Sequence, residues 1–344
     1  MGVNISSLIE AKNLELSDLR GRSIAIDAHN VIYQFLSIIR QPDGTPLKDS
    51  QGRVTSHLSG LLNRSANLLE NGISPSFVFD GKPPEMKTDT LEYRRERRIQ
   101  ALEDWKQARE SGDLEKAFSK ASQSSRLTND ILESSRLLLQ GLGIPVVEAP
   151  GEGEAQAAYM CRQGDIYAAG SQDYDSLLFG APRLVRNMAV TGRRKMPGAK
   201  GLYRTVNVEI IHLDQLLEDL QIDRLQLVDM CIMIGTDFHK GIAGVGPKRG
   251  LKLIREHGDL LGALQSIGME IEDFQSIRDI FLHADHNPDY DLRLGAPDRE
   301  AVKELLCETH DFSPARVDSV LDKIELSLHQ QEEQKRQQTL DKWF

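Results

Sequence analysis

The chain has 344 residues, of which 27% are charged and 40% apolar, and its formal net charge is −10 at pH 7. This length can bury a sizeable core in one large domain or two smaller ones, and the composition is that of an ordinary globular protein. The negative net charge argues against a general nucleic-acid-binding surface, although it can hide local basic patches, and no apolar run is long enough to span a membrane.

Two apolar runs near the N-terminus end in an aspartate. Residues 23–26 indicate a first strand that ends at Asp27, and residues 76–79 indicate a second strand that ends at Asp80. In a doubly wound parallel sheet the carboxyl ends of the strands share one edge, and functional sites form there. Aspartate also follows strands as an ordinary turn residue, so the two positions together carry more weight than either alone.

Helical patterns occupy much of the sequence between and after these strands. Residues 31–36 and 58–69 have apolar residues at helical spacing, and the loop 41–53 between them is rich in Pro, Gly and Asp. Residues 82–136 are helical and polar, with basic residues interleaved with glutamates. Such a pattern is typical of a solvated face, and the alternative is a surface that contacts phosphate. A further strand is expected at 145–147.

Two acidic pairs with a spacing of two follow in residues 143–180. Glu152 and Glu154 open a helical stretch that ends at Gly164, and Asp173 and Asp175 follow a buried strand at 166–169. If the backbone at Asp173 and Asp175 is extended, both carboxylates point the same way. Each pair alone fits a charged helix start or a solvated strand end. Together they predict a site for hard divalent cations.

The second half of the chain has two features that suit a phosphate backbone. Residues 183–204 contain seven basic residues and no acidic one, which fits an exposed hairpin that contacts phosphate or a solubilising loop. An apolar helix at 225–234 leads to Asp237, and a glycine-rich turn with Gly244 and Gly246 precedes another helix. Free amides at that second helix's start can bind an anion.

The C-terminal segment after Leu328 is polar and is expected to be a disordered linker. It ends in Leu340, Trp343 and Phe344, three large apolar residues that are costly to expose without a partner. They could bind another protein or dock on the body of this one.

These motifs, taken in order along nearly the whole chain, resemble the flap endonuclease family of structure-specific 5′ nucleases. The resemblance rests on MGV, IAIDA, YQFL, TSHL, FVFDGKPPE, EGEAQAAYM, QDYDSLLFG, GTDF, GVGPKR and the terminal Q-x-x-L-x-x-W-F. The short spacing between Arg98 and Gly143 favours a flap endonuclease over the related excision-repair nuclease. A chain that ends at the terminal box, without a basic tail, is more similar to archaeal members than to eukaryotic ones.

The resemblance implies an α/β fold with a mostly parallel central sheet flanked by helices, as in 5′ nucleases of the PIN type. It implies a nuclease core at 1–215 with a helical arch at about 82–136, a helical region with a helix-hairpin-helix motif at 216–328, and a flexible tail at 329–344 that carries a sliding-clamp-binding box. An archaeal-type protein would be cytoplasmic and associated with the nucleoid, whereas a eukaryotic one would be nuclear.

The implied activity is 5′-flap endonuclease and 5′–3′ exonuclease cleavage of DNA in replication, including Okazaki fragment maturation, and in repair. The implied metal ligands are seven carboxylates: Asp27, Asp80, Glu152, Glu154, Asp173, Asp175 and Asp237. So many clustered carboxylates could not all stay ionised without cations, and oxygen ligands suit Mg²⁺ or Mn²⁺. Two such ions about 4 Å apart could activate a water and stabilise the leaving oxygen.

The resemblance also implies roles in substrate binding. Lys87 and Arg94 would act at the scissile phosphate, and Tyr33 would stack on a base. The DNA contacts would comprise Arg40, Arg64, Gly244, Gly246, Lys248 and Arg249, with a K⁺ ion at the helix-hairpin-helix. The partners would be branched DNA with a 5′ flap and the sliding clamp PCNA, bound through residues 337–344, chiefly Gln337, Leu340, Trp343 and Phe344.

Three positions depart from the family pattern: His29, Gly151 and Phe238. None of them is a predicted ligand, but His29 could lie near the metals and change the response to pH. Two alternatives stay open. A catalytically silent DNA-binding adaptor of the clamp would have lost carboxylates, and all seven are present. A mainly exonucleolytic 5′ nuclease would differ in its preference for flapped over blunt or recessed DNA.

Overall fold

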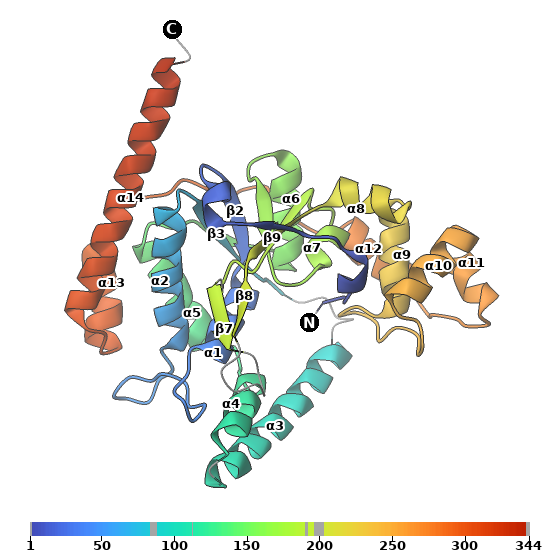
Figure 1. The fold of residues 1–344 in the computed structure, drawn as a ribbon, viewed down its shortest axis with the longest axis horizontal. Coiled ribbons are helices and arrows are strands. Elements are labelled where there is room, and N and C mark those ends of the chain that lie inside the picture. Colours follow the sequence, from blue (N-terminus) through green and yellow to red (C-terminus); the bar gives the residue numbers. More distant parts are fainter. Residues whose placement is uncertain (1, 83–87, 112, 190–191, 196–202, 342–344) are drawn as a thin grey trace.

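The structure is a computed structural model that describes residues 2–82, 88–111, 113–189, 192–195 and 203–341. Its centre is a seven-stranded sheet with the strand order β1-β9-β6-β5-β2-β3-β4 (Figure 1). The five strands from β6 to β4 are parallel, and β9 pairs antiparallel with β6 and with β1. The strands of this sheet are β1 (Lys12–Leu14), β2 (Ser23–Asp27), β3 (Ser74–Phe79), β4 (Val146–Glu148), β5 (Ala168–Gly170), β6 (Arg183–Arg186) and β9 (Val208–His212).

Helices cover both faces of this sheet. Those of the first half are α1 (Ala28–Ile38), α2 (Ser56–Glu70), α3 (Thr88–Glu110), α4 (Leu114–Gln123), α5 (Asn129–Gly141), α6 (Gly153–Gln163) and α7 (Asp175–Leu178). Those of the second half are α8 (Leu213–Leu220), α9 (Arg224–Ile234), α10 (Pro247–His257), α11 (Leu260–Ser266), α12 (Phe274–Leu282), α13 (Arg299–Lys303) and α14 (Pro314–Asp341). Short 3₁₀ turns lie at Ser6–Leu8 and Leu16–Leu19, and a π-helix, η4, lies at Glu304–Thr309.

The buried apolar side chains form two clusters, one on each face of the sheet. Neighbouring strand residues point to opposite faces, as the period of two requires: Ala25 belongs to one cluster, and Ile24 and Ile26 belong to the other. The first cluster contains residues of α6 to α12, and the second contains residues of α1, α2, α5, α13 and α14. A mostly parallel sheet with helices on both faces confirms the predicted α/β fold.

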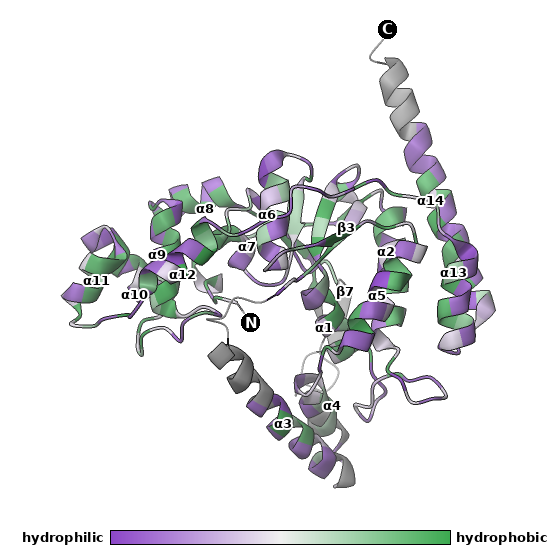
Figure 2. Cartoon of the chain, turned by 180° about the vertical axis from the view of Figure 1, so that it is seen from behind, coloured by the Kyte–Doolittle hydropathy of each residue, from purple (hydrophilic) through white to green (hydrophobic). Residues whose placement is uncertain are grey.

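The helices α3 and α4 form a pair that extends away from the body (Figures 1 and 2). They pack on each other, and Ala101, Ala108, Ala117 and Ala121 are buried within the pair or against the loop at Gly44. The Trp105 indole donates to the backbone oxygen of Asp43, at 3.2 Å, which ties α3 to the loop after α1. The expected helical and polar character of 82–136 is therefore confirmed for the part that the structure describes.

Several expectations about the elements need correction. The strand at Ser23–Asp27 is not the first, because β1 precedes it; three mainly exposed residues give no apolar run by which to detect it. The basic stretch 183–204 is not one loop, since its first residues form β6 inside the main sheet. Its later residues include a hairpin of β7 (Gly192–Lys195) and β8 (Tyr203–Val206), as expected.

The segment expected to be a disordered linker continues α14 up to Asp341. The prediction was wrong because polarity was taken as disorder, although Gln, Glu, Lys and Arg are good helix formers and no Gly or Pro interrupts them. The start of α14 is anchored, because Val317, Leu321 and Ile324 are buried in the second core cluster. The C-terminal helices thus pack beside α2 and α5, whereas α9 to α12 pack on the other face; the division at residue 215 itself stays a prediction.

Candidate active site

The direct junction between β2 and α1 places the first predicted ligand at the carboxyl edge of the sheet. Asp27 ends β2 and is the N-cap of α1, where its Oδ1 accepts a hydrogen bond from the backbone N–H of Asn30 at 3.0 Å. The side chain is buried, and burial together with the charge of Asp80 raises the pKa of Asp27 to about 7. The two aspartates that follow neighbouring strands therefore lie close together, as predicted.

Asp80 receives a donor on each oxygen. Its Oδ1 accepts from the backbone N–H of Gly153 at 2.7 Å, and its Oδ2 lies 2.7 Å from Nδ1 of His29. Gly153 begins α6, and a Cβ at this position would lie 2.7 Å from Asp80 Oδ1. A glycine is therefore required for the start of α6 to approach the carboxylate this closely, and the approach brings the α6 acidic pair to the same edge.

The two glutamates lie at the N-terminus of α6. Glu152 is the N-cap residue, and Glu154 lies in the first turn, where its Oε1 accepts a hydrogen bond from the Ser176 hydroxyl at 3.2 Å. Burial and then the charge of Asp175 hold the pKa of Glu154 well above its usual range. Glu154 thus lies inside the acidic cluster.

The Asp173 and Asp175 pair converges as predicted, but not by the predicted geometry. The backbone there is not extended, because β5 ends at Gly170 and Asp175 is the first residue of α7. Asp173 Oδ2 accepts from the Asn30 amide at 3.1 Å, and Asp175 Oδ1 accepts from the backbone N–H of Val3 at 2.9 Å. Burial, followed by the charge of Asp237, raises the pKa of Asp175 to about 7.

Asp237 enters from the helical region of the chain. It is buried and follows Gly235, the residue that ends α9. Its charge acts on Asp175, so the segment after α9 reaches the same sheet edge as the strand ends. Electrostatic contacts therefore link six of the seven predicted ligands, and Glu152 lies two residues from Glu154, which is one of the six.

The donor set of this cluster suits a hard divalent cation. Among the described residues, no three His, Cys, Asp or Glu side chains already form a metal-binding group. The cluster nevertheless fits such an ion chemically, because its ligands are carboxylate oxygens, and burial and the neighbouring negative charges raise the pKa values of Asp27, Glu154 and Asp175. A bound cation would favour the ionised forms of all of them.

Three contacts to the cluster were not predicted as contacts from the sequence. Asn30 and the backbone of Val3 each donate to one carboxylate, and His29, which the sequence placed only near the metals, contacts Asp80 directly. The N-cap pattern at Asp27 predicts only the hydrogen bond from the backbone N–H of Asn30, not the contact of its side chain with Asp173. Nothing in the sequence indicates the contact of Val3, which spans 172 residues.

The predicted DNA contacts near α1 and α2 are partly used inside the protein. Arg40 donates to the backbone oxygen of Gly44 and to the Ser125 hydroxyl, both at 2.7 Å, and burial lowers its pKa. Arg64, on α2, donates to Asn67 at 2.9 Å, and burial lowers its pKa to about 10. Tyr33 lies on α1 and is half-buried. A role in DNA binding stays a prediction for each.

The glycine-rich turn between α9 and α10 has the expected shape of a backbone anion site. Val245 is buried and anchors the turn, while Gly244 and Gly246 on either side are exposed. Gly244 has a φ of +79°, which favours glycine, and Gly246 is the N-cap of α10. Lys248 and Arg249 lie exposed in the first turn of α10. Helix, hairpin and helix are therefore present as predicted, and ligand binding stays a prediction.

The remaining predicted site residues cannot be placed. Lys87, Trp343 and Phe344 lie outside the described residues. Arg94 lies on α3, and Gln337 and Leu340 lie on α14, but the structure describes only the backbone at these positions.

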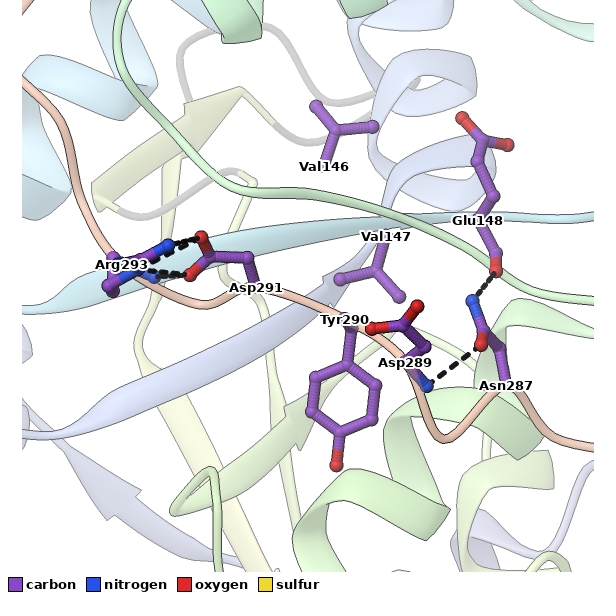
Figure 3. Close-up of a pocket in the computed structure, with 8 residues that line it drawn as sticks. All are labelled: Val146, Val147, Glu148, Asn287, Asp289, Tyr290, Asp291 and Arg293. Carbon is purple, nitrogen blue, oxygen red and sulfur yellow. Dashed lines mark hydrogen bonds and ion pairs between the residues drawn. The ribbon is translucent and has the colours of Figure 1, made fainter.

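A separate open groove of about 660 Å³ lies between β4 and the extended segment 287–293 (Figure 3). Asn287 anchors this segment, because its backbone N–H donates to Gln156 Oε1 at 2.7 Å and its side chain points to the backbone oxygen of Glu148. The groove is lined by Val146, Val147, Glu148, Asn287, Asp289, Tyr290, Asp291 and Arg293. None of these is a predicted site residue, so the groove is distinct from the acidic cluster.

Similar solved structures share this fold. The flap endonuclease-1 from Methanococcus jannaschii is 38% identical, with a TM-score of 0.76 over 96% of this chain and 99% of that one. The catalytic core of Rad2 in complex with DNA substrate is 23% identical, with a TM-score of 0.66 over 93% of this chain and 97% of that one. At that identity Rad2 supports the fold alone.

Comparisons of the sequence agree over the full length. The XPG N-terminal domain matches residues 1–101, and the XPG I-region matches residues 143–237. Flap endonuclease 1 of Methanosarcina acetivorans is 50% identical over 100% of both chains. That of Thermococcus onnurineus is 49% identical over 100% of this chain and 99% of its own. The chain therefore belongs to the flap endonuclease 1 family, in its archaeal form, and is a nuclease.

Proposed function

We propose that this nuclease hydrolyses the phosphodiester bond at the base of 5′ flaps in DNA replication and repair, with the acidic cluster at the sheet edge as its catalytic centre. The observation that carries the proposal is the convergence of carboxylates from five separate parts of the chain on one buried place. Burying so many like charges is unfavourable for folding. A reaction that requires bound cations explains why the carboxylates are nevertheless clustered.

The ions would be Mg²⁺, or Mn²⁺, held by the seven carboxylates. When bound, two divalent cations supply an activated water and charge stabilisation for an in-line displacement at phosphorus. The chain's own contribution is to hold the carboxylates in place through hydrogen bonds from Gly153, Asn30 and Val3. It also excludes water, since Asp27, Asp175 and Asp237 are buried.

Basic residues would complement the carboxylates at the scissile phosphate. By family resemblance, Lys87 and Arg94 take this role, and their spacing of seven residues corresponds to about two helical turns. The flap's free 5′ end would pass through or under the arch that α3 and α4 form. The exposed turn at Gly244 and Gly246, with Lys248 and Arg249, would hold the downstream duplex and could bind K⁺ through its backbone carbonyls.

The partners would be branched DNA and a sliding clamp. Among structural relatives, Rad2 is described with a DNA substrate, and human GEN1 (21% identical, TM-score 0.63, over 94% of this chain and 77% of that one) with Holliday junction DNA. The clamp would be PCNA, bound through residues 337–344. No helix in the described part of the chain has the length and apolar character that crossing a membrane requires.

The test is cleavage of a double-flap DNA with Mg²⁺, with product lengths mapped, beside blunt and recessed duplexes of the same sequence. Asp173→Ala should abolish cleavage and largely keep DNA affinity, because contacts elsewhere bind the phosphate backbone. Asp214→Ala, an exposed aspartate in the first turn of α8, is the matched control and should cleave normally. Normal cleavage by Asp173→Ala would contradict the site assignment, and equal rates on all three substrates would favour a mainly exonucleolytic enzyme.

A silent clamp adaptor is the other alternative. It would bind flapped DNA and clamp but release no product with Mg²⁺ or Mn²⁺. The presence of all seven carboxylates argues against it.

A further inference from the structure

The first turn of α1 carries two consecutive side chains that bind carboxylates from different strands. His29 contacts Asp80, which follows β3, and Asn30 contacts Asp173, which comes after β5. Because β2 lies between β5 and β3 in the sheet, the helix that follows β2 stands between these two carboxylates. Successive residues on a helix point about 100° apart, so one turn can reach both sides.

The contact of His29 with Asp80 has a defined geometry. Nδ1 lies 2.7 Å from Asp80 Oδ2, and the imidazole meets the Phe79 ring edge-on, with the ring centroids 6.0 Å apart and the planes at 86°. The side chain is 22% exposed. Since the carboxylate only accepts hydrogen bonds, Nδ1 is the donor. This ring therefore has a fixed orientation, and it fixes the carboxylate in turn.

The other oxygen of Asp80 is fixed independently. It accepts from the backbone N–H of Gly153 at 2.7 Å, at the start of α6. With one donor on each oxygen, the carboxylate can neither rotate about its Cβ–Cγ bond nor move along the sheet edge without breaking a hydrogen bond. Asn30 is held in the same way, because Gln34 donates to its Oδ1 at 2.5 Å.

We propose that His29 is a positioning residue that holds Asp80 in its orientation toward the catalytic cations, while Asn30 does the same for Asp173. The inference rests on the proposed function, because it assumes that Asp80 and Asp173 are metal ligands. It goes beyond that function by assigning a role to a histidine where the family pattern leads us to expect a small or apolar residue. Removing a side chain that orients a metal ligand typically weakens metal binding about 10–100-fold.

The experiment measures Mn²⁺ binding to the DNA-free protein, from the free-ion signal in electron paramagnetic resonance. His29→Ala and His29→Gln should weaken binding about 10–100-fold, because neither places a nitrogen where Nδ1 lies. His29→Asn should keep most of the affinity, because its Nδ2 is the same number of bonds from the backbone as Nδ1. His329→Ala is the matched control: this exposed histidine also faces a carboxylate, Glu333, one helical turn away.

A second readout is cleavage as a function of Mg²⁺ concentration. The His29→Ala enzyme should need about 10–100-fold more Mg²⁺ for its half-maximal rate and should recover most of the wild-type rate at saturation. A packing role alone would instead lower the rate at every Mg²⁺ concentration. If the alanine variant fails to fold, the comparison of the Gln and Asn variants decides.

The inference is overturned if the Ala, Gln and Asn variants bind Mn²⁺ with the same affinity as one another, because the position of the nitrogen would then make no difference. Tighter binding by His29→Ala also overturns it, because the histidine would then compete with the ion for Asp80. Asp80→Asn separates this inference from the proposed function. If Asp80→Asn binds Mn²⁺ and cleaves DNA normally, the ligand assignment itself fails. If it loses both while His29→Ala behaves as wild type, only the inference fails.

Discussion

Replacing Asp175 with asparagine should stabilise the metal-free protein while abolishing cleavage. Asp175 is buried, and burial and the charge of Asp237 raise its pKa from 3.8 to about 7. Asparagine has nearly the same shape and keeps the oxygen that accepts from Val3 N–H. The substitution therefore removes the buried charge and leaves the packing intact.

The magnitude follows from the pKa. A rise from 3.8 to about 7 corresponds to about 4 kcal/mol of unfavourable free energy when the carboxylate is ionised in the folded state. Since the asparagine amide also has to be accommodated in a buried site, we expect a net gain of about 2–4 kcal/mol. At Asp175 the folded protein binds more protons than the unfolded chain between pH 3.8 and 7, so the contribution of this carboxyl to wild-type stability falls as pH rises through that range. The gain from the substitution should be full above pH 7 and absent below about pH 4.

The assay is urea unfolding with EDTA at pH 8 and pH 4, followed by circular dichroism. Adding Mg²⁺ at pH 8 should stabilise the wild type more than Asp175→Asn, because a ligand that binds only the folded state stabilises it. The reasoning is refuted if the variant is no more stable than wild type at pH 8, or if its advantage is the same at pH 4. Asp214→Asn, at an exposed position, is the matched control and should change stability little at either pH.

Three further predictions concern other parts of the chain. Arg278→Ala should destabilise the protein by about 3–5 kcal/mol in urea unfolding, because it leaves the buried carboxylate of Asp229, now 2.6 Å from Arg278 Nε, without its cation. The contribution of His57 to stability should fall as pH drops from 6.5 toward 3, because burial lowers the pKa of His57 to about 3 and only the unfolded chain takes up the proton. His57→Gln should make that fall smaller by about 3 kcal/mol at pH 4, measured by urea unfolding. Deleting residues 337–344 should leave flap cleavage unchanged and remove clamp binding in calorimetry; unchanged clamp affinity would contradict the assignment of the box.

The sequence was most informative where a local pattern is enough to set a position in space. A buried strand that ends in aspartate places its carboxylate at one edge of a parallel sheet, so Asp27 and Asp80 could be brought together from the sequence alone. The start and end of α6 were equally predictable. The acidic residues Glu152 and Glu154 mark its start, and Gly164, with a φ of +83°, follows its last helical residue. These features depend on a few neighbouring residues.

Predictions failed where tertiary contacts override local preference. Asp173 and Asp175 were expected to converge through an extended backbone, yet a helix begins at Asp175 and the convergence depends on Asn30 and Val3. The internal contacts of Arg40, which tie the loop at Gly44 to Ser125, were likewise not predicted, and its role in DNA binding stays a prediction. No pattern of neighbouring residues encodes contacts that span 85 or 172 positions.

The position of the cluster among helix starts explains how the fold holds it. Asp27 caps α1, Glu152 and Glu154 open α6, and Asp175 opens α7. A helix N-terminus carries partial positive charge and unsatisfied N–H groups, so each helix offsets part of the repulsion within the cluster. The compensation is partial, because Asp27, Asp175 and Glu154 keep raised pKa values. A site built this way can fold before a cation arrives and still retain a strong electrostatic preference for binding one.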